Sequence, residues 1–461
     1  LLSSLSFRAR LGEVRALGRP IPGARLDRQI QAVGVTAPQN TALRTLALVV
    51  AVLGLSCAVS ARAHLPELFG RTFVLEPEPA APPTVRPAPE EDGSALARVR
   101  EAEALENALK TLEMQTGPYA GDLSDPLMQL ATLYSQQGNA VAALRSLDQA
   151  LHVLRINNGL LHPVQLPVLR QLPELYAQIG DFESGQLVWR YAYRIHGFAE
   201  LPLADDALED AMAYFQFARD AFIAPGSPIG NRRFLEAYQD NEDLFDRLRD
   251  SENADADQLL AVGISFLRNL YVVLGTDISG ELGPVSGDIA ASGYERMRGM
   301  QTFGLRRGLD VLDLLLEAAV DGSAVDRAQL LVERANWQQW NGKTQSAAGD
   351  YLSAFALLDG SPAALSLRSQ LAQPALLPED PALWRSLQGP DMPVRAIVRA
   401  SYEVSETGDA RELEVEAEGD ASSALAGRLR RILAESHYRP ALRDGVGFSA
   451  TITGRRYRLL R

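Results

Sequence analysis

The sequence predicts a mainly α-helical protein, built as an array of helix pairs, that ends in a small α+β domain. The first observation is an internal near-repeat: the run LYSQQG at 133–138 is matched 42 residues later by LYAQIG at 175–180. The second is the spacing of apolar residues by three and four positions over most of the chain, which is typical of helices with one buried face. The third is a change after about Gly389 to alternating apolar and polar residues, which is typical of strands.

The near-repeat indicates helix pairs that stack on one another. Leu127 and Leu130 in the first unit are matched by Leu169 and Leu172 in the next, so the same apolar positions recur. One helix pair cannot bury its apolar face alone, and neighbouring pairs must therefore stack. Stacked pairs form extended grooves that bind other proteins, which points to an interaction protein.

Residues 1–34 are interpreted as sequence upstream of the true start of the protein. The chain opens with Leu1, and its first methionine is Met114, deep in the repeat region. A start codon other than ATG at Val33 or Val35 would account for this.

Residues 35–63 have the parts of a secretory signal peptide. They contain Arg44, an apolar run at 46–55 and a small-residue ending at 61–63. The 17 residues between Arg44 and Arg62 are short for a bilayer span, which needs about 20. We therefore expect a cleaved signal, with an uncleaved inner-membrane anchor as the alternative. Cys57, the single cysteine, fits a bacterial lipidation site poorly.

Composition limits the possible partners. Residues 64–94 are rich in proline and acidic residues and predict an extended linker. The whole chain has a net charge of −13, which argues against nucleic acid as a partner, because binding phosphates requires a basic surface. We expect membrane contact only if residues 44–63 are retained as an anchor.

Capping residues predict helix ends in the repeat region, 95–200. Asp125 and Pro126 predict the start of a helix, with Asp as the cap and Pro in the first turn. Gly138 predicts its end, because glycine accepts the left-handed backbone that often follows a helix. Pro173 in the second unit predicts a kink or a lost hydrogen bond.

Further helices are predicted beyond the clear repeat. Residues 201–321 keep the apolar spacing but not the repeated residues, so we expect degenerate units there. At 322–388 we expect a third helix pair and a linker, since Trp337, Gly342 and Tyr351 keep the offsets of the earlier units.

The last segment, 389–461, predicts a separate small domain. Alternating residues favour a two-stranded hairpin over 394–418, followed by an amphipathic helix over 421–436 and a last strand over 447–460. The order strand–strand–helix–strand makes an α+β domain near the lower size limit for folding alone.

The residues of the repeat resemble those of the tetratricopeptide repeat (TPR) family, in a form with long units. Leu130, Ala131, Leu133, Tyr134 and Gly138 follow the order that the family uses in its first helix and turn. In that family the first helix of each pair lines the concave face. Carried over by position, the resemblance implies that the groove residues are Met128, Thr132, Gln136, Arg170, Glu174 and Gln178.

The C-terminal segment resembles the C-terminal domain of the TonB energy transducers. The resemblance rests on the run YEVSETG at 402–408 and on a second run at 437–445, which contains Tyr438, Arg439, Pro440, Asp444 and Gly445. It implies a domain that docks on an outer-membrane receptor by adding a strand to it.

The arginines of the last strand form a basic patch in an acidic protein. The patch comprises Arg455, Arg456, Arg458 and Arg461. Its positive charge could attract an acidic partner or protect the edge of a sheet from pairing with another chain.

The sequence carries no nucleotide-binding, zinc-protease or serine-hydrolase motif, and its five histidines lack metal-ligand spacing. We therefore expect no cofactor, no metal and no enzymatic activity. The predicted function is a periplasmic TPR scaffold that binds a protein or peptide partner in the cell envelope. The alternative is a membrane-anchored relative of the TonB transducers, facing the periplasm and acting in outer-membrane transport. An enzyme that uses a carboxylate of the groove is a third and more distant possibility.

Overall fold

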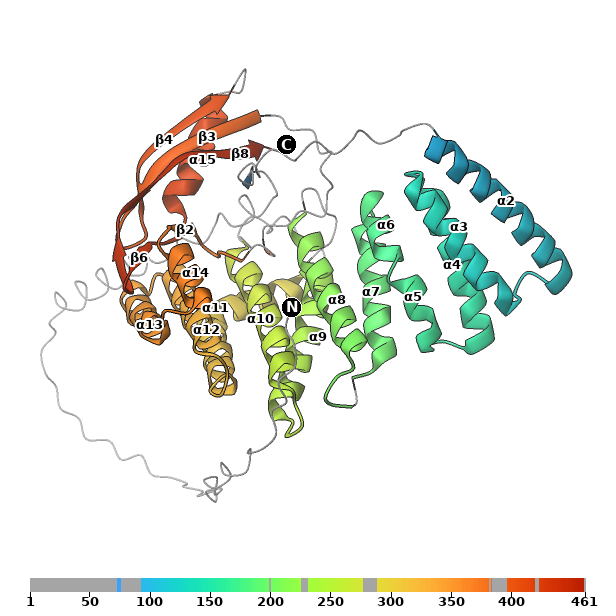
Figure 1. Cartoon of the computed structure of the whole chain (residues 1–461), viewed down its shortest axis with the longest axis horizontal. Helices are drawn as coiled ribbons and strands as arrows, with labels where there is room; N and C mark the ends of the chain where they lie inside the picture. Colours follow the sequence, from blue (N-terminus) through green and yellow to red (C-terminus); the bar gives the residue numbers. More distant parts are fainter. Residues whose placement is uncertain are drawn as a thin grey trace, which may run out of the picture. The chain divides into compact units, whose positions relative to one another are not determined.

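The computed structural model describes residues 73–75, 93–198, 200–224, 231–276, 288–380, 383, 396–418 and 423–459. The predicted upstream segment, the predicted signal or anchor, and the linker apart from 73–75 and 93–94 lie outside these residues. The described chain is mainly helical, with a small strand-containing region at its C-terminal end (Figure 1).

The N-terminal half consists of helices that pack on their neighbours in the chain (Figure 1). In order they are α2 (Gly93–Thr116), α3 (Ser124–Gln136), α4 (Ala140–Asn158), α5 (Leu166–Leu169), α6 (Leu172–Gln178), α7 (Phe182–His196), α8 (Asp205–Ile223) and α9 (Asn231–Asp250).

The second half begins with long helices, namely α10 (Ala256–Gly275), α11 (Asp288–Ala318), α12 (Ala324–Trp340), α13 (Thr344–Leu357) and α14 (Pro362–Leu371). The main strands and the last helix follow as β3 (Ala396–Val404), β4 (Ala410–Glu418), α15 (Ser423–Glu435) and β8 (Ala450–Leu459). Short strands are β1 (Phe73–Leu75), β2 (Ala375–Leu376), β5 (Tyr438–Arg439), β6 (Ala441–Arg443) and β7 (Val446–Phe448).

Side-chain caps set several helix ends. Asn139 accepts a hydrogen bond from the backbone N–H of Ala142 at the start of α4, and Asp181 accepts one from Ser184 at the start of α7. Each cap satisfies one backbone donor that the helix leaves unpaired. Pro173 lies in the first turn of α6, where its missing N–H removes no helical bond. The predicted disturbance is a two-residue interruption between α5 and α6, at Arg170 and Gln171, whose backbone stays in the right-handed helical region.

Helix α2 buries less than its pattern predicts. Ala102 and Leu109 are buried against the following helices, but Leu96 and Val99 in the first two turns are exposed. The apolar spacing continues beyond the point where a neighbouring helix covers that face.

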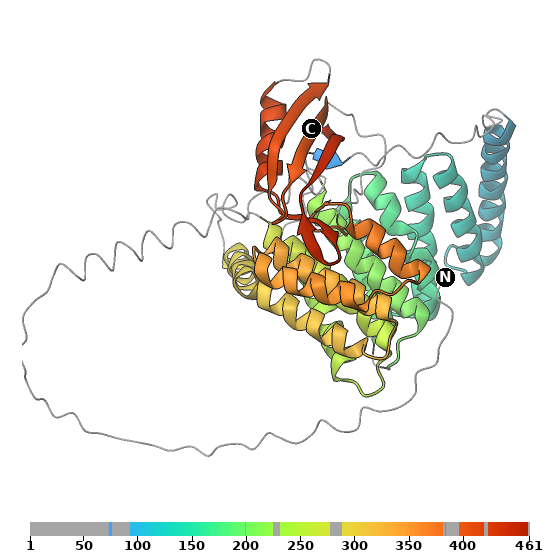
Figure 2. The ribbon, with the colours of Figure 1, turned by 60° about the vertical axis from the view of Figure 1, so that its left-hand side comes forward.

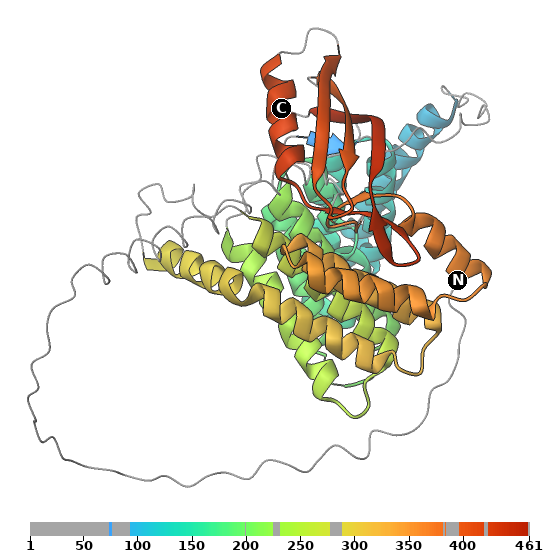
Figure 3. The same ribbon diagram turned by 90° about the vertical axis from the view of Figure 1, so that its left-hand side faces the viewer.

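The packing of α7 to α11 goes beyond consecutive contacts. Helix α7 also packs against α9, α9 against α11, and α8 against α10. Figures 2 and 3 show the bundle of green, yellow and orange helices from two further sides. Apolar side chains from these helices form the largest hydrophobic core. Helix α10 is long and apolar enough to cross a membrane, but 72% of its most apolar stretch is buried inside the protein, as expected for a core helix.

This core contains a buried guanidinium. Arg219 on α8 is only 1% exposed. Its guanidinium donates to the backbone carbonyl of Ser265, at 3.1 Å, and to Oδ1 of Asn269, at 2.8 Å, both on α10. A buried guanidinium needs such acceptors because its desolvation is otherwise very unfavourable.

The strands form one four-stranded antiparallel sheet and two small ribbons. The sheet order is β1-β8-β3-β4, and α15 packs on it against β4 and β3 (Figure 3). A β-bulge interrupts β3 near Tyr402. The ribbon of β2 with β5 joins the chain just after α14 to the chain just after α15. Leu376 and Leu442 belong to the cores of the sheet and of α12–α14, respectively. Helices α12–α14 and the sheet therefore share buried contacts.

The contact between α11 and α12 depends on Gly308. A Cβ atom at this position would overlap the buried indole ring of Trp337, which donates a 3.0 Å hydrogen bond to the carbonyl of Leu305. Gly299, on the same helix, has open space around the position of a Cβ.

These two glycines make a matched pair for a stability test. Gly308→Ala should destabilise the protein by about 1–3 kcal/mol through overpacking against Trp337. Gly299→Ala should leave stability unchanged or raise it by up to about 1 kcal/mol, because alanine is the better helix former. Urea unfolding followed by circular dichroism measures both, and equal effects would contradict the packing described.

Candidate functional site

The residues predicted to line a groove are mostly accessible. Thr132 and Gln136 on α3, and Glu174 and Gln178 on α6, are exposed. Met128 is half-buried and packs against the N-terminal core. Four of the six residues therefore offer polar side chains that a partner could reach.

Arg170, the sixth predicted groove residue, is held in an ion-pair network. Its Nε lies 2.7 Å from Oδ1 of Asp210, and its Nη2 lies 3.4 Å from Asp206. Asp210 is buried, and its Oδ2 also lies 2.8 Å from Nε2 of His196. These contacts link the turn between α5 and α6 to α7 and α8, so Arg170 stabilises the packing of neighbouring helices.

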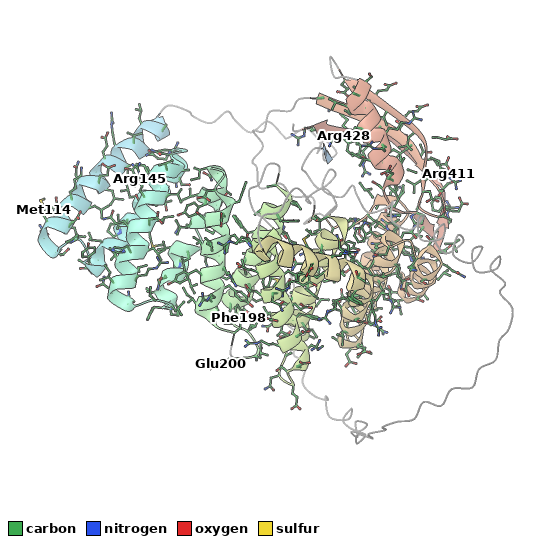
Figure 4. All side chains as sticks on the ribbon, turned by 180° about the vertical axis from the view of Figure 1, so that it is seen from behind. Met114, Arg145, Phe198, Glu200, Arg411 and Arg428 are labelled. Atoms are coloured by element: carbon green, nitrogen blue, oxygen red, sulfur yellow. The ribbon has the colours of Figure 1, made fainter. Side chains whose placement is uncertain are left out.

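A cleft of about 900 Å³ opens elsewhere, between the C-terminal end of α7, the loop after it, and α9. We call it the α7–α9 cleft. Figure 4 labels Phe198, one of its lining residues, beside the end of α7. The lining has an apolar part and a charged part and comprises Leu161, Tyr193, Arg194, Gly197, Phe198, Leu201, Asp240, Asp243, Leu244, Asp246, Arg247, Asp250 and Ser251.

The apolar part includes two residues with unusual backbone geometry. Leu161 has φ of 59° and Phe198 has φ of 50°, a left-handed conformation that costs energy for residues other than glycine. Tyr191 accepts a hydrogen bond from the N–H of Leu161, and the ring of Phe198 packs on that of Tyr193 in a tilted arrangement, with centroids 4.3 Å apart. Such strain persists only where surrounding contacts hold it, and it concentrates at functional sites.

The acidic residues of the cleft differ in their partners. Asp240 accepts a 3.0 Å hydrogen bond from Tyr214 and pairs with Arg190 at 3.3 Å. Burial raises the pKa of Asp240, although Arg190 opposes the shift.

The three remaining aspartates lie nearer the solvent. Asp246 and Asp250 both pair with Arg249, at 2.6 and 2.9 Å. Asp243 is exposed, and within the described part of the chain its partner is the amide of Gln239, at 2.8 Å, with no cation paired to it. Asp243 is therefore available to a positively charged group from outside.

The cleft was not predicted from the sequence, although its aspartates leave a signal there. Asp240, Asp243, Asp246 and Asp250 follow one another at intervals of three and four residues, which places them on one face of a helix. Their apolar partners come from separate loops, so no local pattern could join the two sets.

The residues at 437–445 make contacts within the protein. Tyr438, Arg439 and Pro440 are buried. The guanidinium of Arg439 donates to both carboxylate oxygens of Glu379, at 3.0 and 2.9 Å, and to the backbone carbonyls of Leu371 and Gln373. This fork of charge-assisted hydrogen bonds ties the strand region to the end of α14.

The end of the same segment lies against α13 and α14. Asp444 is exposed and pairs with Arg368 at 3.4 Å. Gly445 has φ of +81°, and a Cβ there would lie 2.8 Å from Cα of Leu352. Nearby, Gln339 of α12 donates a 2.7 Å hydrogen bond to the carbonyl of Thr407 in the β3–β4 turn.

The arginines of β8 have partners on the sheet. Arg456 pairs with Glu418 of β4 at 3.3 Å, and Arg399 of β3 pairs with the same carboxylate at 2.9 Å. The hydrogen bond from Arg399 lowers the pKa of Glu418. Residues 457–459 lie between β1 and β3, so this part of β8 is not a sheet edge. Arg461 lies outside the described residues.

A second group of ionisable residues lies where α10, α12 and the chain after α14 meet. Tyr271 donates a 3.0 Å hydrogen bond to Glu333, and Arg268 pairs with Asp380 at 2.5 Å. Burial raises the pKa of Glu333 to about 7, and the neighbouring carboxylates of Asp380 and Glu379 add to the shift. None of these residues lines the α7–α9 cleft.

Comparisons with known proteins do not assign the chain to a family. No known protein family matches the chain, and no curated protein matches it at a significant level. Within the described residues, no group of three histidine, cysteine or acidic side chains is placed to hold a metal ion.

The contacts of Arg439 lead to a stability prediction. Arg439→Gln should destabilise the protein by about 3 kcal/mol, the lower end of the cost of breaking a buried pair, because Glu379 remains reachable by water. Arg431→Gln, an exposed position on α15, should change stability by less than about 0.5 kcal/mol. Equal urea midpoints for the two variants would contradict the role of the fork.

The raised pKa of Glu333 leads to a prediction about the pH dependence of stability. The folded protein holds a proton on Glu333 between the ordinary glutamate pKa of 4.5 and the raised pKa of about 7, whereas the unfolded chain releases it. Stability from this group is therefore greatest below pH 4.5 and falls as pH rises to about 7. Glu333→Gln should remove this part of the pH dependence. Melting temperatures across the range measure the difference, and parallel curves for the two proteins would contradict it.

Proposed function

We propose that the protein is an exported scaffold of TPR type, which binds a protein or peptide partner in the periplasm through its helix pairs. The observation that supports this most is the packing of helices two apart in the chain, α7 with α9, α9 with α11, and α8 with α10. In a stacked array each helix pair contacts its neighbouring pairs, and contacts between helices two apart in the chain are expected from such stacking.

The exposed polar residues on α3 and α6 fit the same proposal. Gln136 and Gln178 occupy equivalent positions in the near-repeat and are both exposed. The exposure of equivalent side chains on the first helices of both units supports contact with one extended partner. Such a surface functions by recognition and needs no reactive group.

The proposal is tested by crosslinking in intact cells. A photo-reactive residue is placed at Gln136 or at Gln178, and for comparison at Gln149, an exposed glutamine on the second helix α4. We expect the same crosslinked partner from the first two positions, in the periplasmic fraction, and none from Gln149. Equal crosslinking from all three positions, or recovery of the protein in the cytoplasm, would refute the proposal.

One observation favours the alternative, a membrane-anchored relative of the TonB transducers that faces the periplasm. Among the described strands, β4 forms one edge of the four-stranded sheet, and an edge strand has backbone groups free to pair with a receptor. The acidic side chains along β4, among them Glu412, Glu414 and Glu416, fit equally well with protection of that edge. Retention of residues 44–63 in the inner membrane would favour this alternative.

A further inference from the structure

The α7–α9 cleft has the size of a site for a few side chains. Its volume of about 900 Å³ lies within the range of about 300–1,000 Å³ that is usual for ligand sites. A folded domain cannot enter such a space, whereas an extended segment of a partner chain can place two or three side chains in it.

The two parts of the lining have different chemistry. Leu161 is 47% exposed and, with Phe198 and Leu201, forms an apolar part. Helix α9 contributes the four aspartates together with Leu244. An apolar surface next to carboxylates suits an amphipathic cation, whose hydrocarbon stem packs on the apolar residues while its charged end reaches the carboxylates.

One carboxylate of the cleft lining favours a positively charged ligand. Of the four aspartates in the lining, Asp240 pairs with Arg190, and Asp246 and Asp250 pair with Arg249. Asp243 is exposed and carries no paired cation within the described chain. Among the aspartates of the cleft lining, Asp243 is therefore the one that faces solvent without a paired cation.

We propose that the α7–α9 cleft binds an extended segment of a partner protein in which an arginine or lysine stands beside a bulky apolar residue. The cation pairs with Asp243, and the apolar side chain packs between Leu161 and Leu201. Arginine suits the site better than lysine, because its planar guanidinium can bind a carboxylate through two parallel hydrogen bonds. This inference rests on the proposed scaffold function and names the chemistry of a partner, at a site separate from the α3–α6 surface.

The test measures binding of a fluorescein-labelled peptide, in which arginine alternates with leucine, by fluorescence anisotropy with the full chain. Asp243→Asn keeps the shape of the side chain and removes its charge, and it should weaken binding about tenfold, equivalent to about 1.4 kcal/mol. Glu317→Gln removes the same charge from an exposed position on α11, outside both the cleft and the α3–α6 surface, and should leave the affinity unchanged. Equal weakening by both variants would overturn the proposal, because it would show attraction to the acidic protein as a whole.

A second variant tests the apolar part. Leu161→Asn should retain the fold, because asparagine tolerates the left-handed backbone at this position. It should also lower the affinity for the peptide. Replacing the leucines of the peptide by serine should have the same effect. A polyamine that competes with the peptide at equal strength would overturn the proposal, since it would show a site for cations alone.

The outcomes separate this inference from the scaffold proposal. If Gln136 and Gln178 crosslink to a partner but Asp243→Asn does not change the affinity for the peptide, the scaffold proposal is supported and the cleft is refuted as a binding site. Peptide binding that depends on Asp243 and Leu161 without those crosslinks would support the cleft and refute the α3–α6 surface as the place of contact.

Discussion

The structure depends on the burial of apolar helix faces that no single helix can cover. Helix α10 is the clearest case, since Val262, Phe266, Leu270 and Val273 are all buried among α8, α9, α11 and α12. Burying side chains of this size contributes about 1.5–3 kcal/mol each. Because α10 is covered on most of its surface, its neighbours have few alternative positions, and even Arg219 enters this core with its acceptors supplied by α10.

The strand region also depends on neighbouring elements to bury its apolar surface. A four-stranded sheet covered by one helix, α15, is small. Further contacts to α12, α13 and α14 are made through Gln339, Gly445 and Arg439. Glu379 and Asp380 are adjacent in the chain, yet one pairs with Arg439 of β5 and the other with Arg268 of α10. Two neighbouring carboxylates therefore connect the strand region to the central helices.

Sequence patterns predicted the elements better than their partners. Apolar spacing located α3, α4 and α12, and alternation located β3 and β4, because periodicity reports which face of an element is buried. It does not report what covers that face, which is why the exposure of Leu96 and Val99 was not anticipated. The fork between Arg439 and Glu379 spans 60 positions in the chain, and the cleft combines residues from 161 to 251. Contacts of this kind arise from packing and leave no local signal.

The pairing of β1 with β8 has a consequence for the order of events during synthesis. Phe73–Leu75 pairs with residues 457–459. One of the first described segments therefore needs one of the last as its partner in the sheet. A ribosome exposes β1 early, and the strand stays unpaired while every helix between them is made. Closing a loop of that length carries a large entropic cost before any hydrogen bond forms. The helices that form earlier shorten this loop, and the sheet is completed only after residues 457–459 have been made.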